Sequence, residues 1–399
     1  MNSGDFILNR RSFVAGSLVA LLLAQSTSSG AQANRCPART GGAEAAGAPI
    51  GLIEIGSSGV KPSIVRILAG DEPDISVVNT GDRLKNTEAN ALDLGNAPIV
   101  AAAVRDAIAA IRAEGVPENM IKIVGSSGVA GRPDAKEAVQ DAVRRVANVE
   151  MTFIPVELET QYTFDGVVNK VRLAHRRSQV TLLDIGSGNT KGCYILSSTG
   201  NVDTFRNFSM NLGTKSFARL VSEKIGDDET FAVAAQRVAS TELRAQIQRM
   251  IVEAGASMAQ RNRVYLNGGL PWAVATTQNP YNTDRYVPLT VNDLDRFANL
   301  ALNDQDRLFD LDTSRIPAGT HRDLITGDLR RLSNRGEGAV FNEQEYQAGG
   351  ALLQVLSEEM ALRNKTLFFT RPGRNAWMLG VAFNDVAQGS LACEALPAA

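Results

Sequence analysis

The most informative segment of this sequence is Val180-Thr181-Leu182-Leu183-Asp184-Ile185-Gly186-Ser187-Gly188-Asn189-Thr190-Lys191. It is a short apolar run that ends in a carboxylate and is followed at once by glycines, which is typical of a buried strand entering a tight turn. Glycine lets the turn adopt positive φ and approach a ligand, and successive amide N–H groups there suit a phosphate. Asp184 would lie at the strand's carboxyl end, where open α/β sheets hold ligands. Ordinary hairpins share the pattern, so alone it leaves a phosphate site and a plain turn open.

A second copy of the pattern occurs nearer the start of the chain. It runs Ile50-Gly51-Leu52-Ile53-Glu54-Ile55-Gly56-Ser57-Ser58-Gly59-Val60-Lys61, and the strand-like residues 63–68 follow it. Both copies contain an apolar strand, an acid, Ile-Gly-Ser, small polar residues, a lysine and a second strand. The repetition predicts a duplicated architecture with one phosphate-holding hairpin in each half.

The composition limits the class of protein and of metal site. A chain of 399 residues permits two domains of ordinary size, and 44% hydrophobic with 21% charged residues fits a globular protein with a sizeable core. A formal net charge of -2 argues against nucleic acid as a partner. The two histidines, His175 and His321, are far apart, which argues against a histidine-built zinc or iron site. A metal ion would be Mg²⁺ or another hard divalent cation held by carboxylates.

The three cysteines are Cys36, Cys193 and Cys393, and they form no CxxC pair. Their spacing excludes a zinc ribbon or a thioredoxin-like site. A bridge between Cys36 and Cys393 is one alternative in an exported protein. Three unpaired, mostly buried thiols are the other.

The N-terminus has the layout of an export signal. Asn9-Arg10-Arg11-Ser12-Phe13 precedes the apolar stretch Val14–Ala24, and Ala31-Gln32-Ala33 has the pattern of a small-x-small cleavage site. The paired arginines resemble a twin-arginine signal, so we expect residues 1–33 to be removed and the protein to be periplasmic or extracellular. The apolar stretch is short for a membrane span, so we expect no stable insertion, with an uncleaved anchor as the alternative. Residues 34–48 predict a flexible lead-in.

The rest of the chain alternates strands and helices in a similar order twice. In the first half, after the hairpin, the patterns predict a strand at 75–78, a helix at 99–113, a strand at 121–124, a helix at 134–146, a strand at 151–156 and a helix at 157–173. In the second half they predict strands at 180–184, 191–197, 202–208, 264–266 and 366–369, and helices at 214–223, 231–254, 291–302, 342–361 and 376–386. Residues 278–290 and 312–336 are loop-rich and receive no element.

This order, with an acid-x-Gly-small hairpin in each half, resembles the actin/hexokinase/Hsp70 ATPase superfamily. Within it, residues 50–385 most resemble the exopolyphosphatase and guanosine-pentaphosphate phosphatase (Ppx/GppA) family. Glu54–Lys61 and Asp184–Lys191 are similar to its two phosphate motifs, Val156–Gln161 to its glutamate segment, and Tyr265–Leu270 to the late glycine turn. The resemblance implies an α/β fold of two ribonuclease-H-like, actin-like ATPase lobes. We expect lobes at 49–175 and 176–399, each with a mixed five-stranded sheet and flanking helices, and a cleft between them.

The resemblance also implies the chemistry, which is hydrolysis of terminal phosphoanhydrides in polyphosphate or another phosphorylated molecule. Glu159 falls at the family's catalytic glutamate, which orients or activates water, with Glu157 as the fallback. Asp184 and Glu54 fall where the family holds Mg²⁺ or another divalent cation. The expected phosphate-binding residues are those of the two turns and their lysines: Ser57, Ser58, Gly59, Lys61, Gly186, Ser187, Gly188, Asn189 and Lys191. For the acids, a turn-capping or helix-capping carboxylate is the alternative.

Three departures from the family pattern bear on activity. Lys191 replaces a glutamate that is often a cation ligand, so cation binding should weaken and direct anion binding strengthen. Glu54 replaces an aspartate, and Ala130 replaces an arginine for which Arg132 is a candidate substitute. A phosphate-binding protein with altered catalysis is therefore the alternative function, and a kinase is the least supported. Export favours an anionic polymer over cytoplasmic nucleotides, and the sequence leaves a homodimer open.

Overall fold

The computed structural model describes residues 49–57, 59–68, 74–77, 84–87, 89–168, 174–199, 202–336, 339–371, 376–382 and 384. The predicted signal peptide and lead-in, residues 1–48, lie outside the described residues, as do Ser58 and Cys393. The export signal, the disulfide alternative and the role of Ser58 therefore stay predictions. Cys193, the cysteine within the described residues, is buried and unpaired.

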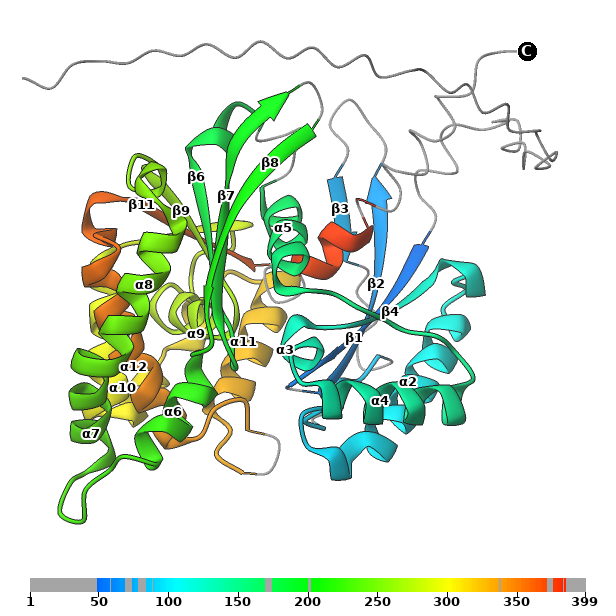
Figure 1. Ribbon diagram of the computed structural model, residues 1–399, viewed down its shortest axis with the longest axis horizontal. Coiled ribbons are helices and arrows are strands. Elements are labelled where there is room, and N and C mark those ends of the chain that lie inside the picture. Colours follow the sequence, from blue (N-terminus) through cyan, green and yellow to red (C-terminus); the bar gives the residue numbers. More distant parts are fainter. Residues whose placement is uncertain are drawn as a thin grey trace, which may run out of the picture. The chain divides into compact units, whose positions relative to one another are not determined.

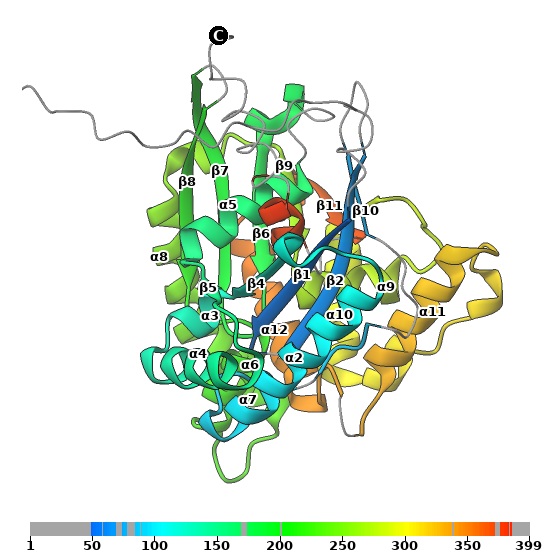
Figure 2. The same cartoon turned by 90° about the vertical axis from the view of Figure 1, so that its right-hand side faces the viewer.

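The first sheet has five strands in the order β3-β2-β1-β4-β5 (Figure 1, Figure 2). Strands β1 to β3 form an antiparallel meander, β4 runs parallel to β1, and β5 runs parallel to β4. β1 is buried almost throughout, which explains its nearly continuous apolar sequence. The bounds are β1 Pro49–Gly56, β2 Gly59–Leu68, β3 Asp74–Val77, β4 Ile121–Gly125 and β5 Thr152–Phe153.

Two longer helices, α2 and α4, pack against this sheet, and together with β1 and β2 they form one hydrophobic core (Figure 2). A Cβ at Gly51 of β1 would lie 2.5 Å from a side-chain carbon of Ile111, so α2 packs directly on the strand. The segment Leu94–Ala113 has the length and apolarity of a membrane span, but its buried side chains belong to this core. The helical elements are η2 Leu94–Asn96, α2 Ala97–Ala113, η3 Glu118–Met120, α3 Ser127–Ala130, α4 Pro133–Ala147 and α5 Val156–Val167.

The second sheet has six strands in the order β10-β11-β9-β6-β7-β8, one more than the sequence predicts. The additional strand β10 lies within 278–290, and Pro288 fits its place at the edge because proline cannot donate to a ladder. Strands β6 to β8 form the meander, and β9 and β11 continue the sheet in parallel. The bounds are β6 Val180–Ile185, β7 Thr190–Thr199, β8 Val202–Met210, β9 Arg263–Asn267, β10 Tyr286–Leu289 and β11 Thr366–Thr370.

The helices of the second half follow the predicted order, but two of them, α9 and α11, were given no predicted range. The region 312–336, left without an element, contains the helix α11. The predicted helix 231–254 is present as α7 and α8, joined by a π-helical turn at Ala239–Leu243. The bounds are α6 Thr214–Ser222, α7 Phe231–Val238, α8 Arg244–Ala254, α9 Gly269–Gln278, α10 Val291–Asn303, α11 Thr320–Ser333 and α12 Glu343–Glu359, with short helical turns at Ala174–Gln179, Ala256–Met258, Gln305–Leu308, Thr313–Arg315 and Leu362–Asn364.

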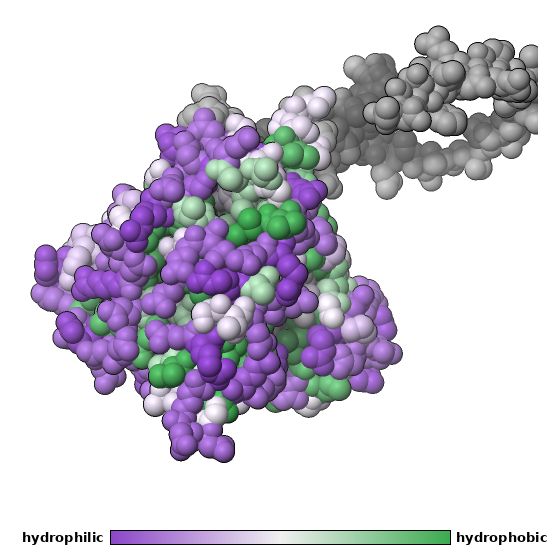
Figure 3. Space-filling view, turned by 60° about the vertical axis from the view of Figure 1, so that its left-hand side comes forward, coloured by the Kyte–Doolittle hydropathy of each residue, from purple (hydrophilic) through white to green (hydrophobic). Residues whose placement is uncertain are grey.

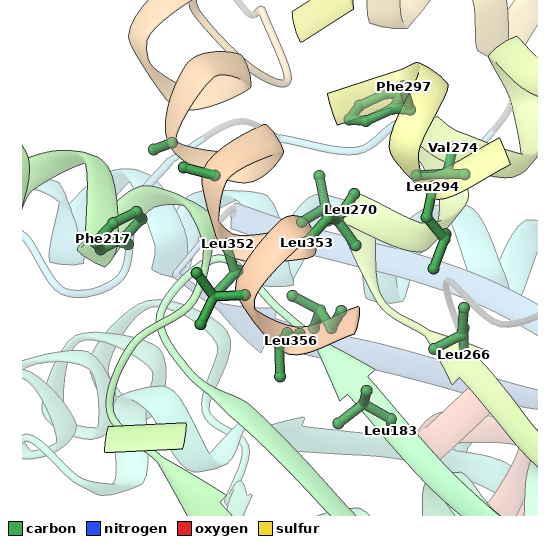
Figure 4. Packing of buried hydrophobic residues seen from close by; sticks show 14 of the residues in the cluster. Leu183, Phe217, Leu266, Leu270, Val274, Leu294, Phe297, Leu352, Leu353 and Leu356 are labelled. Atoms are coloured by element: carbon green, nitrogen blue, oxygen red, sulfur yellow. The ribbon is translucent and has the colours of Figure 1, made fainter. Parts of the chain in front are cut away.

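Helix α12 lies at the centre of the second hydrophobic core (Figure 4). Two adjacent glycines let its neighbours come close: a Cβ at Gly349 would lie 2.8 Å from Leu270 of α9, and one at Gly350 would lie 2.9 Å from the carbonyl oxygen of Ala298 in α10. The core joins α6, α9, α10 and α12 to β6 and β9. The labelled members are Leu183, Phe217, Leu266, Leu270, Val274, Leu294, Phe297, Leu352, Leu353 and Leu356.

Two helical segments each pack against the sheet of the other half of the chain. Helix α5 follows the first sheet in the chain but packs through Phe164 and Val167 in a core with β6, β7 and β9. The helical residues 376–382 follow the second sheet but pack with β1, β2 and β4. The two segments cross closely, since a Cβ at Gly166 would lie 2.0 Å from the carbonyl oxygen of Ala376 and one at Gly380 would lie 1.9 Å from that of Tyr162. The boundary at 175 stays a prediction.

The surface face in Figure 3 is mostly hydrophilic, and its apolar residues are scattered in small patches. The most exposed large hydrophobic side chains of the described residues, such as Val252, Val233 and Leu324, come from three different helices. Single exposed apolar residues are ordinary on a protein surface. The described residues of this face therefore offer no large apolar patch for a partner.

Candidate functional site

Both predicted acids lie near the carboxyl ends of the first strand of each sheet. Glu54 in β1 and Asp184 in β6 are nearly buried, at 6% and 7% exposed. In each hairpin the acid is paired in register with the lysine that ends the motif, Glu54 with Lys61 and Asp184 with Lys191. Opposite residues of an antiparallel pair project from the same face of the sheet. The two halves therefore place a carboxylate beside an ammonium in the same way.

Lys191 is the centre of the second half's charge cluster. Its Nζ lies 2.5 Å from Oε1 of Glu159 and 3.7 Å from Oδ2 of Asp184. Lys191 and Glu159 are only 5% and 4% exposed. A lysine and two carboxylates this deeply buried are stabilised by one another, because an isolated buried charge is very unfavourable.

Glu159 connects this cluster to the first half. It lies in the first turn of α5, and its Oε2 accepts a hydrogen bond of 2.5 Å from the amide N–H of Ser127, the first residue of α3. Ser127 directly follows the turn after β4, and the amide of Ser126 in that turn donates to Ile55 of β1. One carboxylate thus contacts the end of the first sheet through one oxygen and the second sheet's lysine through the other.

The pKa shifts follow from this arrangement. Burial opposes ionisation of Glu159, but the Lys191 ammonium and the Ser127 amide outweigh it and lower the pKa of Glu159. Burial also opposes the charge on Lys191, yet Glu159 and Asp184 raise its pKa. Burial raises the pKa of Asp184, and the opposing effects of Lys191 and Asn267 do not cancel it. The Lys191–Glu159 pair is therefore ionised at neutral pH, and Asp184 binds a proton more readily than a free aspartate.

Glu54 has one free oxygen. Its Oε1 is 3.0 Å from Nζ of Lys61, whose side chain is 24% exposed, whereas its buried Oε2 has no hydrogen-bond partner among the described residues. A Cβ at Gly56 would lie 3.2 Å from Glu54 Oε1 and 3.5 Å from Oγ of Ser126. The glycine leaves this space open beside the carboxylate, because any side chain there would enter it.

The first turn is covered by another segment of the chain. Val60 and Thr87 exchange backbone hydrogen bonds of 2.9 Å. Gly59 has a φ of +117°, and a Cβ there would lie 1.8 Å from the carbonyl oxygen of Thr87. Gly59 is therefore explained by close backbone packing. Of the predicted phosphate ligands in this turn, Ser57 is partly exposed and Lys61 reaches the surface.

The second turn is held by the start of α6. The carbonyl of Gly186 accepts from the amide of Thr214, and the carbonyl of Ser187 accepts from the amides of Lys215 and Ser216. The hydroxyl of Ser216 donates to the carbonyl of Gly188. The amides at the start of α6 are thus used within the protein. The amides of Ser187 and Gly188 themselves donate to no backbone carbonyl of the described residues, so they remain available to an anion.

The late glycine turn contributes two neighbours to Asp184 that the sequence analysis did not place in the site. Asn267, the last residue of β9, is paired in register with Asp184, and its Oδ1 is buried without a partner among the described residues. Gly268 has a φ of +92°, and a Cβ there would lie 2.5 Å from Oδ1 of Asp184. The asparagine ending an apolar strand before two glycines was the available signal.

Two predicted candidates lie away from the cluster. Glu157, the fallback catalytic acid, is exposed, whereas Glu159 two residues later is buried. Arg132, which the resemblance offered as a substitute for the arginine replaced by Ala130, is exposed and paired with Asp134. The helical period explains the difference between the two glutamates, because positions two apart point in different directions. Glu159 remains the better candidate.

The residues expected to hold a divalent cation do not fit one. No group of three or more His, Cys, Asp or Glu side chains suited to a metal ion occurs in the part of the chain that the structure describes. Each strand-end acid instead faces an ammonium, Glu54 that of Lys61 and Asp184 that of Lys191. Mg²⁺ is usually bound by one or two carboxylates together with waters and phosphate oxygens at about 2 Å, and here each such carboxylate already lies beside a positive charge. The carboxylates of this site therefore surround lysine ammonium groups and not a position for a metal ion.

Comparisons with known proteins bear on the fold. No family model and no curated protein matches the sequence. A Ppx/GppA family member of Aquifex aeolicus is similar over 86% of this chain and 98% of its own, with a TM-score of 0.55 and 14% identity. An exopolyphosphatase from Cytophaga hutchinsonii is similar over 85% of this chain and 98% of its own, with a TM-score of 0.52 and 14% identity. The chain therefore has the two-lobe, actin-like ATPase fold of the Ppx/GppA proteins, and the predicted fold class is confirmed.

Proposed function

We propose that this chain is an exported phosphoanhydride hydrolase of the exopolyphosphatase type, which releases phosphate from polyphosphate or a related anionic polymer. The observation that carries the proposal is Glu159, a buried carboxylate that contacts the β4–α3 turn and Lys191 at once. It lies with Asp184 at the end of β6, where α/β sheets hold ligands. The similar fold of a Ppx/GppA family member and of an exopolyphosphatase supports the same class.

The phosphate chain would bind at the second turn and the exposed end of the first hairpin. The free amides of Ser187 and Gly188 supply hydrogen bonds to phosphate oxygens, and Lys61 supplies a partly exposed positive charge. Asn189 and Ser57 are partly exposed in the same turns. Lys191 lies beside the proposed catalytic Glu159. Because the reaction takes place at the terminal phosphate, we expect Lys191 to contact that phosphate group.

The reaction would use Glu159 to orient the attacking water. An entering phosphate competes with Glu159 for the Lys191 ammonium, and this frees Oε1 to accept a hydrogen bond from water. The water oxygen attacks the terminal phosphorus, the bond from that phosphorus to the bridging oxygen breaks, and the water proton passes to Glu159. Phosphoryl transfer depends mainly on position and charge neutralisation, which Lys191 and the turn amides would supply.

The experiment measures phosphate release from polyphosphate by the purified mature protein. A Glu159→Gln variant should lose at least about 100-fold in rate, in line with the contribution of general acid–base groups. Glu157→Gln is the matched variant on the same helix, and because that side chain is exposed its rate should stay close to wild type. No release by the wild type, or equal release by the Glu159→Gln variant, would reject the hydrolase.

A second candidate is a polyphosphate-binding protein without hydrolysis. One observation favours it: both carboxylate oxygens of Glu159 are already engaged, and its lowered pKa makes it a weak base. Calorimetry with polyphosphate separates the candidates. Saturable binding without phosphate release, unchanged by Glu159→Gln, supports the binding protein, whereas release that depends on Glu159 excludes it.

Export is a separate part of the proposal and rests on Arg10, Arg11 and the apolar stretch that follows. Residues 1–48 fused to a reporter should direct it across the membrane, and replacing both arginines by lysine should retain it inside. Secretion that ignores this replacement would contradict the twin-arginine route. We propose no nucleic-acid partner, and light scattering of the purified protein tests for a homodimer.

A further inference from the structure

We infer that the ammonium group of Lys191 takes the place of a divalent cation in this site, so that the site binds phosphate chains without one. The inference rests on the proposed ligand, a phosphate polymer, and adds how its charge is balanced. Lys191 Nζ lies 2.5 Å from Glu159 and 3.7 Å from Asp184, which is a position between two carboxylates. A cation ligated by the same carboxylates would have to share that position.

The like charge of Lys191 excludes a second cation there. Mg²⁺ would bind Asp184 at about 2 Å, which brings it close to the lysine nitrogen. Two positive charges at such a separation repel strongly in a buried site, where the effective dielectric constant is low. Glu159 and Asp184 hold the lysine nitrogen in this position, so a cation would have to displace it.

The first half repeats the arrangement. Lys61 Nζ lies 3.0 Å from Glu54 Oε1, so the second acid expected to hold a cation also faces an ammonium. The other oxygen of Glu54 is buried without a partner among the described residues, but a cation bound to it would lie close to the Lys61 ammonium and be repelled by it. Neither strand-end acid is therefore organised for a metal ion.

Lysine at position 191 changes the net charge of the acidic cluster. The acids Glu54, Glu159 and Asp184 are opposed by the two ammonium groups of Lys61 and Lys191. An acid at position 191 would leave four carboxylates against one lysine, and a phosphate chain would then need a bound cation to approach. With lysine at position 191, the positive charge that neutralises the carboxylates belongs to the protein itself. A phosphate chain can then bind without a metal ion.

The first experiment measures Mn²⁺ binding to the ligand-free mature protein by the loss of the free-ion electron paramagnetic resonance signal. We expect no saturable binding to wild type at submillimolar Mn²⁺. The Lys191→Glu variant restores an acid beside Asp184 and Glu159, and it should bind Mn²⁺ at least about tenfold more tightly, which is 1.4 kcal/mol. Lys191→Met removes the ammonium without adding a ligand. Comparing it with Lys191→Glu therefore separates the effect of losing the repulsion from the effect of gaining a carboxylate ligand.

The second experiment measures polyphosphate binding by calorimetry in EDTA. Wild type should bind in EDTA, Lys191→Glu should bind only when Mg²⁺ is added, and Lys191→Met should bind more weakly in both. Lys224→Met is the matched control, because Lys224 is an exposed lysine paired with Glu242 outside the site and its loss should change neither measurement.

The outcomes separate the inference from the proposed function. Tight Mn²⁺ binding by wild type, or polyphosphate binding that EDTA abolishes, would overturn the inference while leaving the hydrolase in place. No polyphosphate binding under either condition would reject the proposed ligand and the inference drawn for it. Binding in EDTA without phosphate release would support the inference and reject only the hydrolase.

Discussion

Nζ of Lys191 and Oε1 of Glu159 lie 2.5 Å apart, although the two residues are 32 positions apart in the chain. Lys191 is on β7 of the second sheet, whereas Glu159 lies in the first turn of α5, the helix that follows the first sheet in the chain. The pair is therefore one of the points at which the two halves are joined by charge. Lys191 is also the residue that stands where the similar Ppx/GppA motif has a glutamate, so the proposed catalytic carboxylate contacts a positive charge here.

Removing the Lys191 charge should destabilise the fold. Lys191→Met leaves Glu159 and Asp184 buried without their counter-ion, and breaking a buried pair from one side costs about 3–5 kcal/mol. Urea unfolding followed by circular dichroism measures the change. The double variant Lys191→Met with Glu159→Gln should recover part of the loss, and strictly additive losses would show that the two side chains do not interact.

Acid should remove the contribution of Glu159. Its folded pKa is lowered from the ordinary value of 4.5, so its stabilising effect is present above pH 4.5 and is lost as the pH falls through the folded pKa. The raised pKa of Lys191 keeps its effect full below pH 10.5, and Asp184, whose pKa is raised, shifts stability in the opposite direction to Glu159 as it protonates.

The measurement compares urea unfolding of wild type and Glu159→Gln across a pH series. The difference in unfolding free energy between them should be constant near neutral pH and should shrink on acidification below pH 4.5. A difference that stays constant down to acid unfolding would contradict the ionised pair.

The helix crossing should tolerate no side chain at Gly380. A Cβ there would lie 1.9 Å from the carbonyl oxygen of Tyr162, and backbone cannot move aside as a flexible side chain can. Gly380→Ala should therefore cost about 3 kcal/mol or more by overpacking. Thermal unfolding measures it.

Gly327 provides the matched control, because it lies inside α11 and a Cβ there would meet nothing within 4 Å. Gly327→Ala should stabilise the protein by about 0.5–1 kcal/mol, the helix preference of alanine over glycine. Equal effects of the two substitutions would contradict the described crossing.

A buried charge network beside the crossing should also matter. Arg177 lies 2.8 Å from Asp165 of α5 and 2.7 Å from Asp203 of β8, and Asp165 also accepts from Asn384. Asp165→Ala leaves Arg177 only one carboxylate in a buried place, with an expected loss of about 2–3 kcal/mol. Asp106→Ala, which breaks the exposed pair with Arg105, is the control and should have little effect. Similar losses from both variants would show that burial does not strengthen the network.

The strongly periodic parts of the fold were predictable from the sequence. The two acid-glycine hairpins, β4, β6 and the helices α2, α4, α10 and α12 have clear apolar spacing that matches their burial. The strand expected at 151–156 shortens to β5, Thr152–Phe153, because Pro155 and the start of α5 end it. β10 was missed because it is four residues long and contains Pro288. α11 was missed because its sequence is rich in charge and contains an internal glycine.

The sequence predicted the acids and lysines at the ends of the strands. It did not predict the contacts that residues of the first half make with residues of the second. The register of the hairpin already implies that Asp184 and Lys191 are neighbours. The approach of Glu159 to Lys191 depends on where α5 packs, and local sequence does not encode that packing. Asn267 joins the site through the parallel pairing of β6 and β9, which are far apart in the chain. Long-range pairing of this kind follows from the whole fold.

Helix α5 has Glu159 in its first turn and Gly166 in its last, seven residues apart and therefore on nearly the same face. Gly166 abuts the backbone of the chain's C-terminal helical segment, while Glu159 is bonded to Lys191 and to the amide of Ser127. The close backbone contact at Gly166 fixes the C-terminal end of α5, and the hydrogen bonds of Glu159 fix its first turn. The position of the proposed catalytic carboxylate therefore depends on packing at both ends of this helix.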